Sequence, residues 1–365
     1  MKAGIITFHR ALNYGALLQA YALKTAIESI GHDADILDYR NAKLEAPYVL
    51  QPFLKQKGVK NKLKYVLKAR REKEKRRRFD GFRAKQLGIA PGEGYTKQTI
   101  SQVNGQYDRF FTGSDQVWNP AAHDFDQNYY LDFVNNKEKK YSYAASFGVS
   151  KLENDYEAQV GKLLDEFTCC SVREEQGAKI VNELSKTPVR VDLDPVFLLT
   201  KENWAKNFQF AQPTEKYALM YHFELTDTQI KMARCCYEAG YKIKFIGKPI
   251  RSVLDFPCEY IPAAGPKEFA ELFYGASFVI TNSFHGTAFA INFGVPMAVE
   301  YLQKTSKVNS RLENILQITG LTDRRICQDT DLGKVLEQEI DWRSVNARVQ
   351  KIRESSLAYL KGCFD

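Results

Sequence analysis

Residues 276–300 read ASFVITNSFHGTAFAINFGVPMAVE, and this stretch decides how the rest of the chain is interpreted. The apolar residues from Ala276 to Ile280, which run out into a polar turn, predict a strand at 278–283, and the small and apolar residues at 286–294 predict a helix. Residues 295–300 begin another strand. A strand, a helix and a second strand in this order are typical of a parallel sheet with a crossover helix.

The same alternation recurs on both sides of this stretch. It predicts strands in the first half at 4–8, 33–40, 108–112, 140–146 and 168–173 and in the second half at 216–223 and 242–247, and helices at 156–166, 226–239, 266–276, 309–319 and 343–361. We therefore expect an α/β fold with two parallel-sheet domains that face a cleft. The expected parts are an N-terminal domain at 1–205, a linker near 200–215, a C-terminal domain at 206–345 and a C-terminal helix at 346–365.

Composition indicates a folded protein in the cytoplasm. The chain has 365 residues, of which 44% are hydrophobic, and this argues against disorder. No apolar run approaches the ~18 residues of a spanning helix, and the apolar start is too short for a signal peptide. Seven cysteines include no Cys-x-x-Cys pair, so we expect core residues and no structural zinc.

Positive charge is concentrated in one segment. Residues 55–78 carry thirteen basic and two acidic side chains, and the chain as a whole has a net charge of +8. We expect a basic helical insertion at 55–85. Leu63, Tyr65, Val66 and Leu67 favour peripheral contact with anionic headgroups at the inner membrane face, and a solvated charged helix is the alternative. Aromatic residues are sparse here, which argues against nucleic acid.

His285 is the first candidate for chemistry. It lies where a predicted strand passes into a predicted helix that begins near Gly286. Backbone N–H groups at a helix start suit a phosphate or carboxylate, and a histidine there can transfer a proton near neutral pH. The alternative is a capping turn with a hydrogen-bonded histidine.

The stretch Gly113-Ser-Asp-Gln-Val-Trp118 is the second candidate. It follows a predicted strand, at the sheet edge where open α/β sheets bind ligands. Asp115 is a candidate general base, and Trp118 a candidate platform for a sugar ring. The alternative is a helix cap at Ser114 or Asp115 beside a core tryptophan.

Other positions suit anionic or close ligands. Arg173 ends a predicted strand, and Arg311 stands at the start of a predicted helix. Arginine binds phosphate and carboxylate through paired N–H groups. For both, a surface role is the alternative. The first loop contains Asn13, Tyr14 and Gly15, where glycine allows close approach. The sequence has no G-x-G-x-x-G, GxxxxGK[ST] or HExxH pattern, which argues against NAD enzymes and P-loop kinases.

Six segments together resemble the polysaccharide pyruvyl transferase family. In order they are NYGALLQAYAL, GSDQVWNP, YAASFG, SVREEQGA, DPVFLL and TNSFHGTAFAINFGVP. The resemblance implies two Rossmann-like domains similar to the GT-B glycosyltransferases, phosphoenolpyruvate as donor, a saccharide as acceptor, and no metal or organic cofactor. The family's histidine motif falls on 283–286, and its arginine before the domain linker matches Arg173. Ser283 departs from the pattern because better-known members carry an arginine there; Arg311, Lys248 and Arg10 are candidates to replace it.

The expected activity is pyruvyl transfer to a saccharide as a ketal, in surface polysaccharide biosynthesis. We expect His285 and Asp115 to be catalytic. The expected donor-binding residues are Arg173, Ser283, Phe284, Gly286, Thr287 and Arg311, and the expected acceptor-binding residues are Asn13, Tyr14, Gly15, Ser114 and Trp118. One alternative is a GT-B-type glycosyltransferase with a nucleotide-sugar donor, and another is a non-catalytic basic binding protein.

Overall fold

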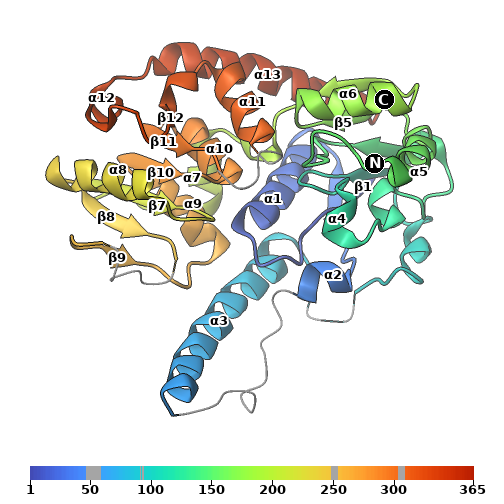
Figure 1. The fold of residues 1–365 in the computed structure, drawn as a ribbon. Coiled ribbons are helices and arrows are strands. Elements are labelled where there is room, and N and C mark those ends of the chain that lie inside the picture. The colour runs from blue at the N-terminus through green and yellow to red at the C-terminus, as the bar shows by residue number, and fades with distance from the viewer. Residues whose placement is uncertain (47–58, 91, 93, 248–253, 303–308) are drawn as a thin grey trace.

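The computed structural model describes residues 1–46, 59–90, 92, 94–247, 254–302 and 309–365, and for 59–68 it describes the backbone alone. Two α/β lobes lie side by side (Figure 1). Each lobe is built on a parallel sheet, as the alternation of strands and helices predicts.

The N-terminal lobe contains a four-stranded parallel sheet in the order β2-β1-β3-β4. A parallel pair, β5-β6, continues it, because single bridges join Tyr141 to Cys169 and Ala145 to Val172. The strands are β1 Lys2–Ile6, β2 Asp33–Ile36, β3 Arg109–Thr112, β4 Lys140–Ser142, β5 Cys170–Val172 and β6 Val189–Val191. The helices are α1 Tyr14–Ser29, α2 Ala42–Glu45, α3 Val59–Gln86, α4 Pro120–His123, α5 Asn154–Leu164, α6 Glu175–Leu184 and α7 Lys201–Phe208.

The C-terminal lobe contains a six-stranded parallel sheet in the order β12-β11-β10-β7-β8-β9. Its strands are β7 Tyr217–Tyr221, β8 Lys242–Phe245, β9 Glu259–Tyr260, β10 Phe278–Thr281, β11 Met297–Glu300 and β12 Arg325–Ile326. The helices are α8 Asp227–Glu238, α9 Pro266–Gly275, α10 Phe284–Phe293, α11 Ser310–Thr319, α12 Leu332–Glu337 and α13 Trp342–Gly362. Strands β7, β10 and β11 are buried along their whole length, as expected for a sheet covered on both faces.

Two features join the lobes. The Tyr14 ring on α1 stacks on Phe269 of α9, with ring centroids 4.4 Å apart. Helix α13 returns to the first lobe, where the Tyr359 hydroxyl donates to the carbonyl of Ser142 at 2.9 Å and Ser356 donates to Asp192 at 2.8 Å. Because the contact between the lobes is apolar and hydrogen-bonded, their carboxyl strand ends are held opposite each other.

The expected linker at 200–215 is partly wrong. Its first half forms α7, which begins at a capping box between Thr200 and Asn203. Trp204 of this helix is fully buried in the core that the two lobes share. Lysine and asparagine are common in linkers, but here they occupy the outer face of a helix whose apolar residues are buried.

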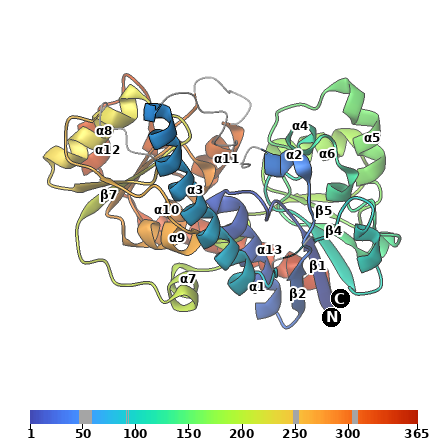
Figure 2. The same ribbon diagram turned by 90° about the horizontal axis from the view of Figure 1, so that it is seen from below.

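Helix α3 runs between the lobes (Figure 2). Near its end, the buried Arg83 side chain donates to the carbonyls of His9, Arg10 and Ala11 at 2.9, 2.9 and 3.3 Å. The basic insertion therefore fixes the loop after β1. The side chains proposed for membrane contact, at 63–67, lie outside the described residues. No described helix combines the length and the apolar character that a membrane crossing needs.

Candidate active site

A cavity of about 220 Å³ lies between the carboxyl ends of the two sheets. The first lobe contributes the loops after β1 and β3, and the second contributes the loops after β7 and β10 and the start of α11. The lining residues are Phe8, Ala11, Asn13, Ala16, Leu44, Asp115, Gln116, Phe223, Asn282, Ser283, Phe284, His285, Leu302, Asn309, Arg311 and Leu312. The expected placement of His285 and Asp115 at facing sheet edges is thus found in one cavity.

His285 is positioned by the tight turn between β10 and α10. Thr281 Oγ1 donates to the Tyr221 carbonyl at 2.5 Å and accepts from the Ser283 N–H at 3.1 Å. Ser283 caps α10, because its Oγ accepts from the Gly286 N–H at 3.4 Å. This turn holds His285, which is 7% exposed, in the first turn of the helix.

Gly15 makes room for the His285 ring. A Cβ atom built on Gly15 would lie 2.1 Å from His285 Nδ1, closer than any real contact. The first loop and the histidine motif therefore pack directly on each other across the domain junction. The role of Gly15 is this close approach, and the acceptor-binding role expected from the sequence receives no support from its position.

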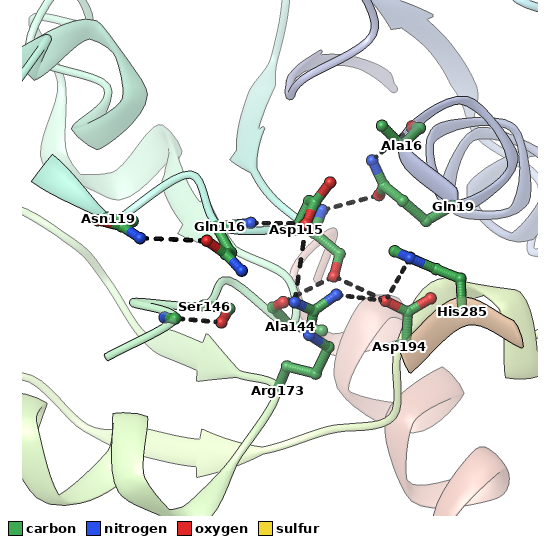
Figure 3. A network of polar contacts seen from close by, with 12 residues as sticks. Ala16, Gln19, Asp115, Gln116, Asn119, Ala144, Ser146, Arg173, Asp194 and His285 are labelled. Atoms are coloured by element: carbon green, nitrogen blue, oxygen red, sulfur yellow. Dashed lines mark hydrogen bonds and ion pairs between the residues drawn. The ribbon is translucent and has the colours of Figure 1, made fainter. Parts of the chain in front are cut away.

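Asp194 joins the candidate residues of both lobes (Figure 3). It is fully buried between the lobes, and its Oδ2 accepts from Arg173 Nη1 at 2.8 Å and from Ser114 Oγ at 3.3 Å. The same oxygen lies 3.6 Å from His285 Nε2. His285 Nε2 is buried, and none of the described groups forms a hydrogen bond with it.

The charges around Asp194 and Arg173 favour the ionised form of both side chains. Burial alone raises the pKa of Asp194, but the interactions with His285 and Arg173 outweigh it, and the pKa lies well below its usual value. Burial likewise lowers the pKa of Arg173, and Asp194, Asp115 and Glu174 more than offset this, so that its pKa is raised. Both groups of the Arg173–Asp194 pair are therefore charged at neutral pH.

Arg173 lies behind the cavity wall and does not line the cavity. Its guanidinium stacks over the Phe284 ring at 4.5 Å, and its Nη2 lies 3.8 Å from Asp115 Oδ1. Arg311 does line the cavity, from the first turn of α11, and its guanidinium lies 5.8 Å from the same ring. The guanidinium groups of Arg173 and Arg311 thus both lie near the Phe284 ring beside the cavity.

Two expected anion contacts are wrong in detail. Helix α10 begins at Phe284 and not at 286, and Ser283 occupies the N–H groups of Gly286 and Thr287, the second through its carbonyl at 2.9 Å. The first backbone N–H groups of a helix lack partners within the helix. The N–H groups of Phe284 and His285, the first two residues of α10, are therefore the ones at this helix start that could bind an anion.

Three acceptor-binding expectations are wrong because the side chains are in the core. Trp118 is fully buried, its Nε1 donates to the Tyr129 carbonyl at 3.2 Å, and its ring stacks on Tyr130. Tyr14 is 5% exposed within the domain junction, and Ser114 is fully buried and donates to the Ala144 carbonyl at 2.8 Å. Asn13 does line the cavity and also caps α1.

Two residues of the site, Asp194 and Gln116, were not expected from the sequence. Asp194 belongs to the DPVFLL segment, where an aspartate before proline is typical of a turn cap, and its Oδ1 does cap the turn at Pro195–Phe197. Its second oxygen completes the site, which the sequence does not reveal.

Of the candidates to replace the family arginine, Arg10 pairs with Asp38, and Lys248 lies outside the described residues. Within the described ranges, no cluster of three His, Cys, Asp or Glu side chains could hold a metal.

A family model described as polysaccharide pyruvyl transferase matches residues 13–300, which include the cavity residues from Asn13 to His285 but not Phe8, Ala11 or those at 302–312. The chain belongs to the polysaccharide pyruvyl transferase family. A search of curated proteins gives no match.

Solved structures share the architecture of this pyruvyl transferase family member. A Listeria monocytogenes protein described as a UDP-N-acetylglucosamine 2-epimerase is 11% identical, with a TM-score of 0.52 over 97% of this chain and 91% of that one. A UDP-GlcNAc 2-epimerase from Methanocaldococcus jannaschii is 13% identical, with a TM-score of 0.48 over 93% of each chain. The similarity to the Listeria protein supports the expected GT-B type of fold; similarity at this level of identity concerns the fold alone.

Proposed function

We propose that the protein transfers a pyruvyl group from phosphoenolpyruvate to a saccharide as a ketal, in surface polysaccharide biosynthesis. The observation that carries this proposal is the cavity in which His285 and Asp115 meet from opposite lobes, with the buried Asp194–Arg173 pair behind them. Family membership supports pyruvyl transfer, and the two helix starts in the cavity wall suit an anionic donor.

The reaction needs a proton donor and a proton acceptor close to one another. A proton adds to the methylene carbon of phosphoenolpyruvate, and a sugar hydroxyl attacks the adjacent carbon and loses its proton. The carbon–oxygen bond to phosphate then breaks, and a second hydroxyl closes the ketal and releases its proton to the departing phosphate. His285 and Asp115 are the proposed pair for these transfers, each worth ~10²–10⁴-fold in rate.

Asp194 has a positioning role in this scheme. An ionised carboxylate 3.6 Å from His285 Nε2 fixes the orientation of the imidazole and stabilises the imidazolium formed when the ring takes up a proton. Because Asp194 also binds Arg173, the position of the histidine depends on residues of both lobes. Arg173 supplies positive charge from behind Phe284 as the negative charge on the leaving phosphate develops.

On the acceptor side, Phe223 takes the place that the sequence suggested for Trp118. Phe223 follows β7, lines the cavity and is 61% exposed. An exposed aromatic ring beside a polar cavity suits the apolar face of a sugar. Asn13, on the opposite wall, is the proposed polar contact to an acceptor hydroxyl. The scheme requires no metal or organic cofactor.

The cellular setting belongs to the same proposal. A lipid-linked saccharide would present the acceptor at the inner membrane face, and the basic segment 55–78 would contact anionic headgroups there. The protein would then act in the cytoplasm, without binding nucleic acid. Liposome flotation at low salt tests this part separately: absence of binding to anionic vesicles would leave α3 a solvated helix that supports the first loop.

Ligand-dependent thermal stability tests the donor. Phosphoenolpyruvate should raise the melting temperature, since a ligand at 100 times its Kd stabilises the folded state by ~2.7 kcal/mol. Uridine and guanosine diphosphate should not. Acceptor saccharide should then trigger phosphate release from phosphoenolpyruvate in the wild type but not in His285→Ala, with His32→Ala as the control histidine. Stabilisation by a nucleotide alone would replace this proposal with a nucleotide-sugar transferase.

A further inference from the structure

Arg311 is a buried cation for which the described protein provides no counter-charge in contact. It is 8% exposed, lines the cavity, and forms no ion pair with a described carboxylate. Its Nε has no hydrogen-bond partner among the residues that the structure describes. Burial, and then the nearby charge of Arg173, lower the pKa of Arg311 to about 10, so the guanidinium remains charged at neutral pH.

Two helix starts converge on this cation. Ser283, Phe284 and His285 at the start of α10 line the cavity, and so do Asn309 and Arg311 at the start of α11. Asn309 does not cap α11, because its side chain exchanges two hydrogen bonds of 2.9 Å with the backbone of Leu302. Both helices therefore present the positive ends of their dipoles to the same cavity.

The contact that Arg311 does make is to a neutral group. In the amide orientation that presents its oxygen, Gln116 lies 2.6 Å from Arg311 Nη2 and 3.1 Å from Nη1. Gly148, at a positive φ of 64°, leaves the space for this amide, because a Cβ there would lie 2.6 Å from Gln116 Cδ. An amide oxygen held on both terminal nitrogens occupies the position that a carboxylate or phosphate oxygen takes in a paired arginine contact.

We infer that Arg311, together with the first turns of α10 and α11, forms an oxyanion subsite for the donor, and that Gln116 holds the guanidinium ready until an anion replaces it. This inference rests on the proposed function for the identity of the donor. It also explains how the site manages with Ser283 at the position of the family arginine: the cation comes from α11, and the serine is left to cap α10.

The chemistry of the subsite is shared by two groups of phosphoenolpyruvate, its carboxylate and its phosphate. Calorimetric titration with phosphoenolpyruvate, pyruvate and inorganic phosphate separates them. Arg311→Gln should weaken phosphoenolpyruvate binding by ~10–100-fold, as expected when a hydrogen bond to a charged group is lost. If pyruvate binding falls in parallel, the subsite takes the carboxylate; if phosphate binding falls, it takes the phosphoryl group.

A second variant separates charge from folding. Gln116→Glu gives Arg311 an internal carboxylate and should weaken phosphoenolpyruvate binding by a similar factor. Arg234→Gln, on the exposed face of α8, is the matched arginine control. If the wild type binds phosphoenolpyruvate and neither Arg311→Gln nor Gln116→Glu weakens it, the subsite is refuted while the proposed function stands. Phosphate binding that depends on Arg311, without phosphoenolpyruvate binding, would keep the subsite and reject the proposed donor; no binding of any oxyanion would refute both.

Discussion

Asp194→Asn is the substitution that tests most directly how the two lobes share one site. The change preserves shape and one acceptor oxygen but removes the negative charge between Arg173 and His285. In the wild type, Asp194 Oδ2 lies 2.8 Å from Arg173 Nη1 and 3.6 Å from His285 Nε2, and the carboxylate is fully buried. The variant therefore leaves a buried guanidinium without its nearest counter-charge.

The expected cost follows from the remaining contacts. Removal of one partner from a buried ion pair typically costs ~3–5 kcal/mol. Asp115 and Glu174 still lie 3.8 Å from the guanidinium, so we expect the free energy of unfolding to fall by about 2–4 kcal/mol. This is a large share of the ~5–15 kcal/mol that stabilises a typical protein. Because the imidazole also loses its orienting carboxylate, we expect turnover to fall by ~10²–10⁴-fold.

The pH dependence of unfolding separates this effect from a simple loss of packing. The pKa of Asp194 is lowered in the folded state, so its stabilising effect is present above the unfolded pKa, near ~4, and is lost as the pH falls below that value. The difference between wild type and variant should therefore be full at pH 7 and shrink in acid. Urea unfolding at several pH values measures it. Asp255→Asn, in an exposed pair with Arg234, is the control and should change little. A difference that does not depend on pH, or turnover equal to wild type, would refute the reasoning.

Three further substitutions test separate parts of the argument. Gly15→Ala should lower turnover by ~10²-fold or more because its Cβ would displace the His285 ring. The control is Gly81→Ala, whose added Cβ meets no described atom within 4 Å outside its own helix backbone, and it should retain wild-type turnover in the same assay. Phe223→Ala should raise the acceptor KM by up to ~10-fold with an unchanged thermal shift from phosphoenolpyruvate; an unchanged KM would remove the ring from the acceptor site. Asp38→Asn should destabilise the fold at neutral pH, and this effect should disappear as the pH falls from ~4 to about 2. Burial alone would raise the pKa of Asp38, but its contacts with His9 and Arg10 lower it to about 2; urea unfolding at pH 7 and pH 2 measures the change.

The sequence predicts the parts of this fold that depend on local pattern. Strands such as 278–283 and helices such as 226–239 follow from periodicity within a few residues of their observed bounds. The placement of His285 and Asp115 in one cavity also follows, because each lies at the carboxyl edge of its own parallel sheet and the two domains are expected to face a cleft. That inference needs the direction of the strands but no knowledge of side-chain packing.

The side-chain environment is what the sequence does not reveal. Trp118 and Tyr14 have the chemistry of sugar platforms, yet both fill cores, because a polar motif can end in a residue that points inward. Asp194 has the pattern of a turn cap and is one, while its other oxygen binds residues that are 80 and 91 positions away in the sequence. Long-range contacts of this kind leave no periodic signal, so they become visible only when both lobes are assembled.

The energetics of the helix start favour a serine at position 283. A serine cap stabilises a helix by ~1 kcal/mol relative to alanine, and a cation in the first turn opposes the helix dipole. With Ser283, α10 keeps its cap and bears no positive charge at position 283 when no donor is bound. Arg311 carries that unfavourable cation on α11 instead, where Gln116 holds it and Phe284 packs beside it. If the proposed subsite binds the donor, an arriving oxyanion would relieve two costs at once, the burial of a guanidinium with no described carboxylate in contact and its repulsion by Arg173, which Glu174, Asp115 and Asp194 offset in part. On this proposal the cavity attracts anions through a cation on α11, while the start of α10 keeps its serine cap.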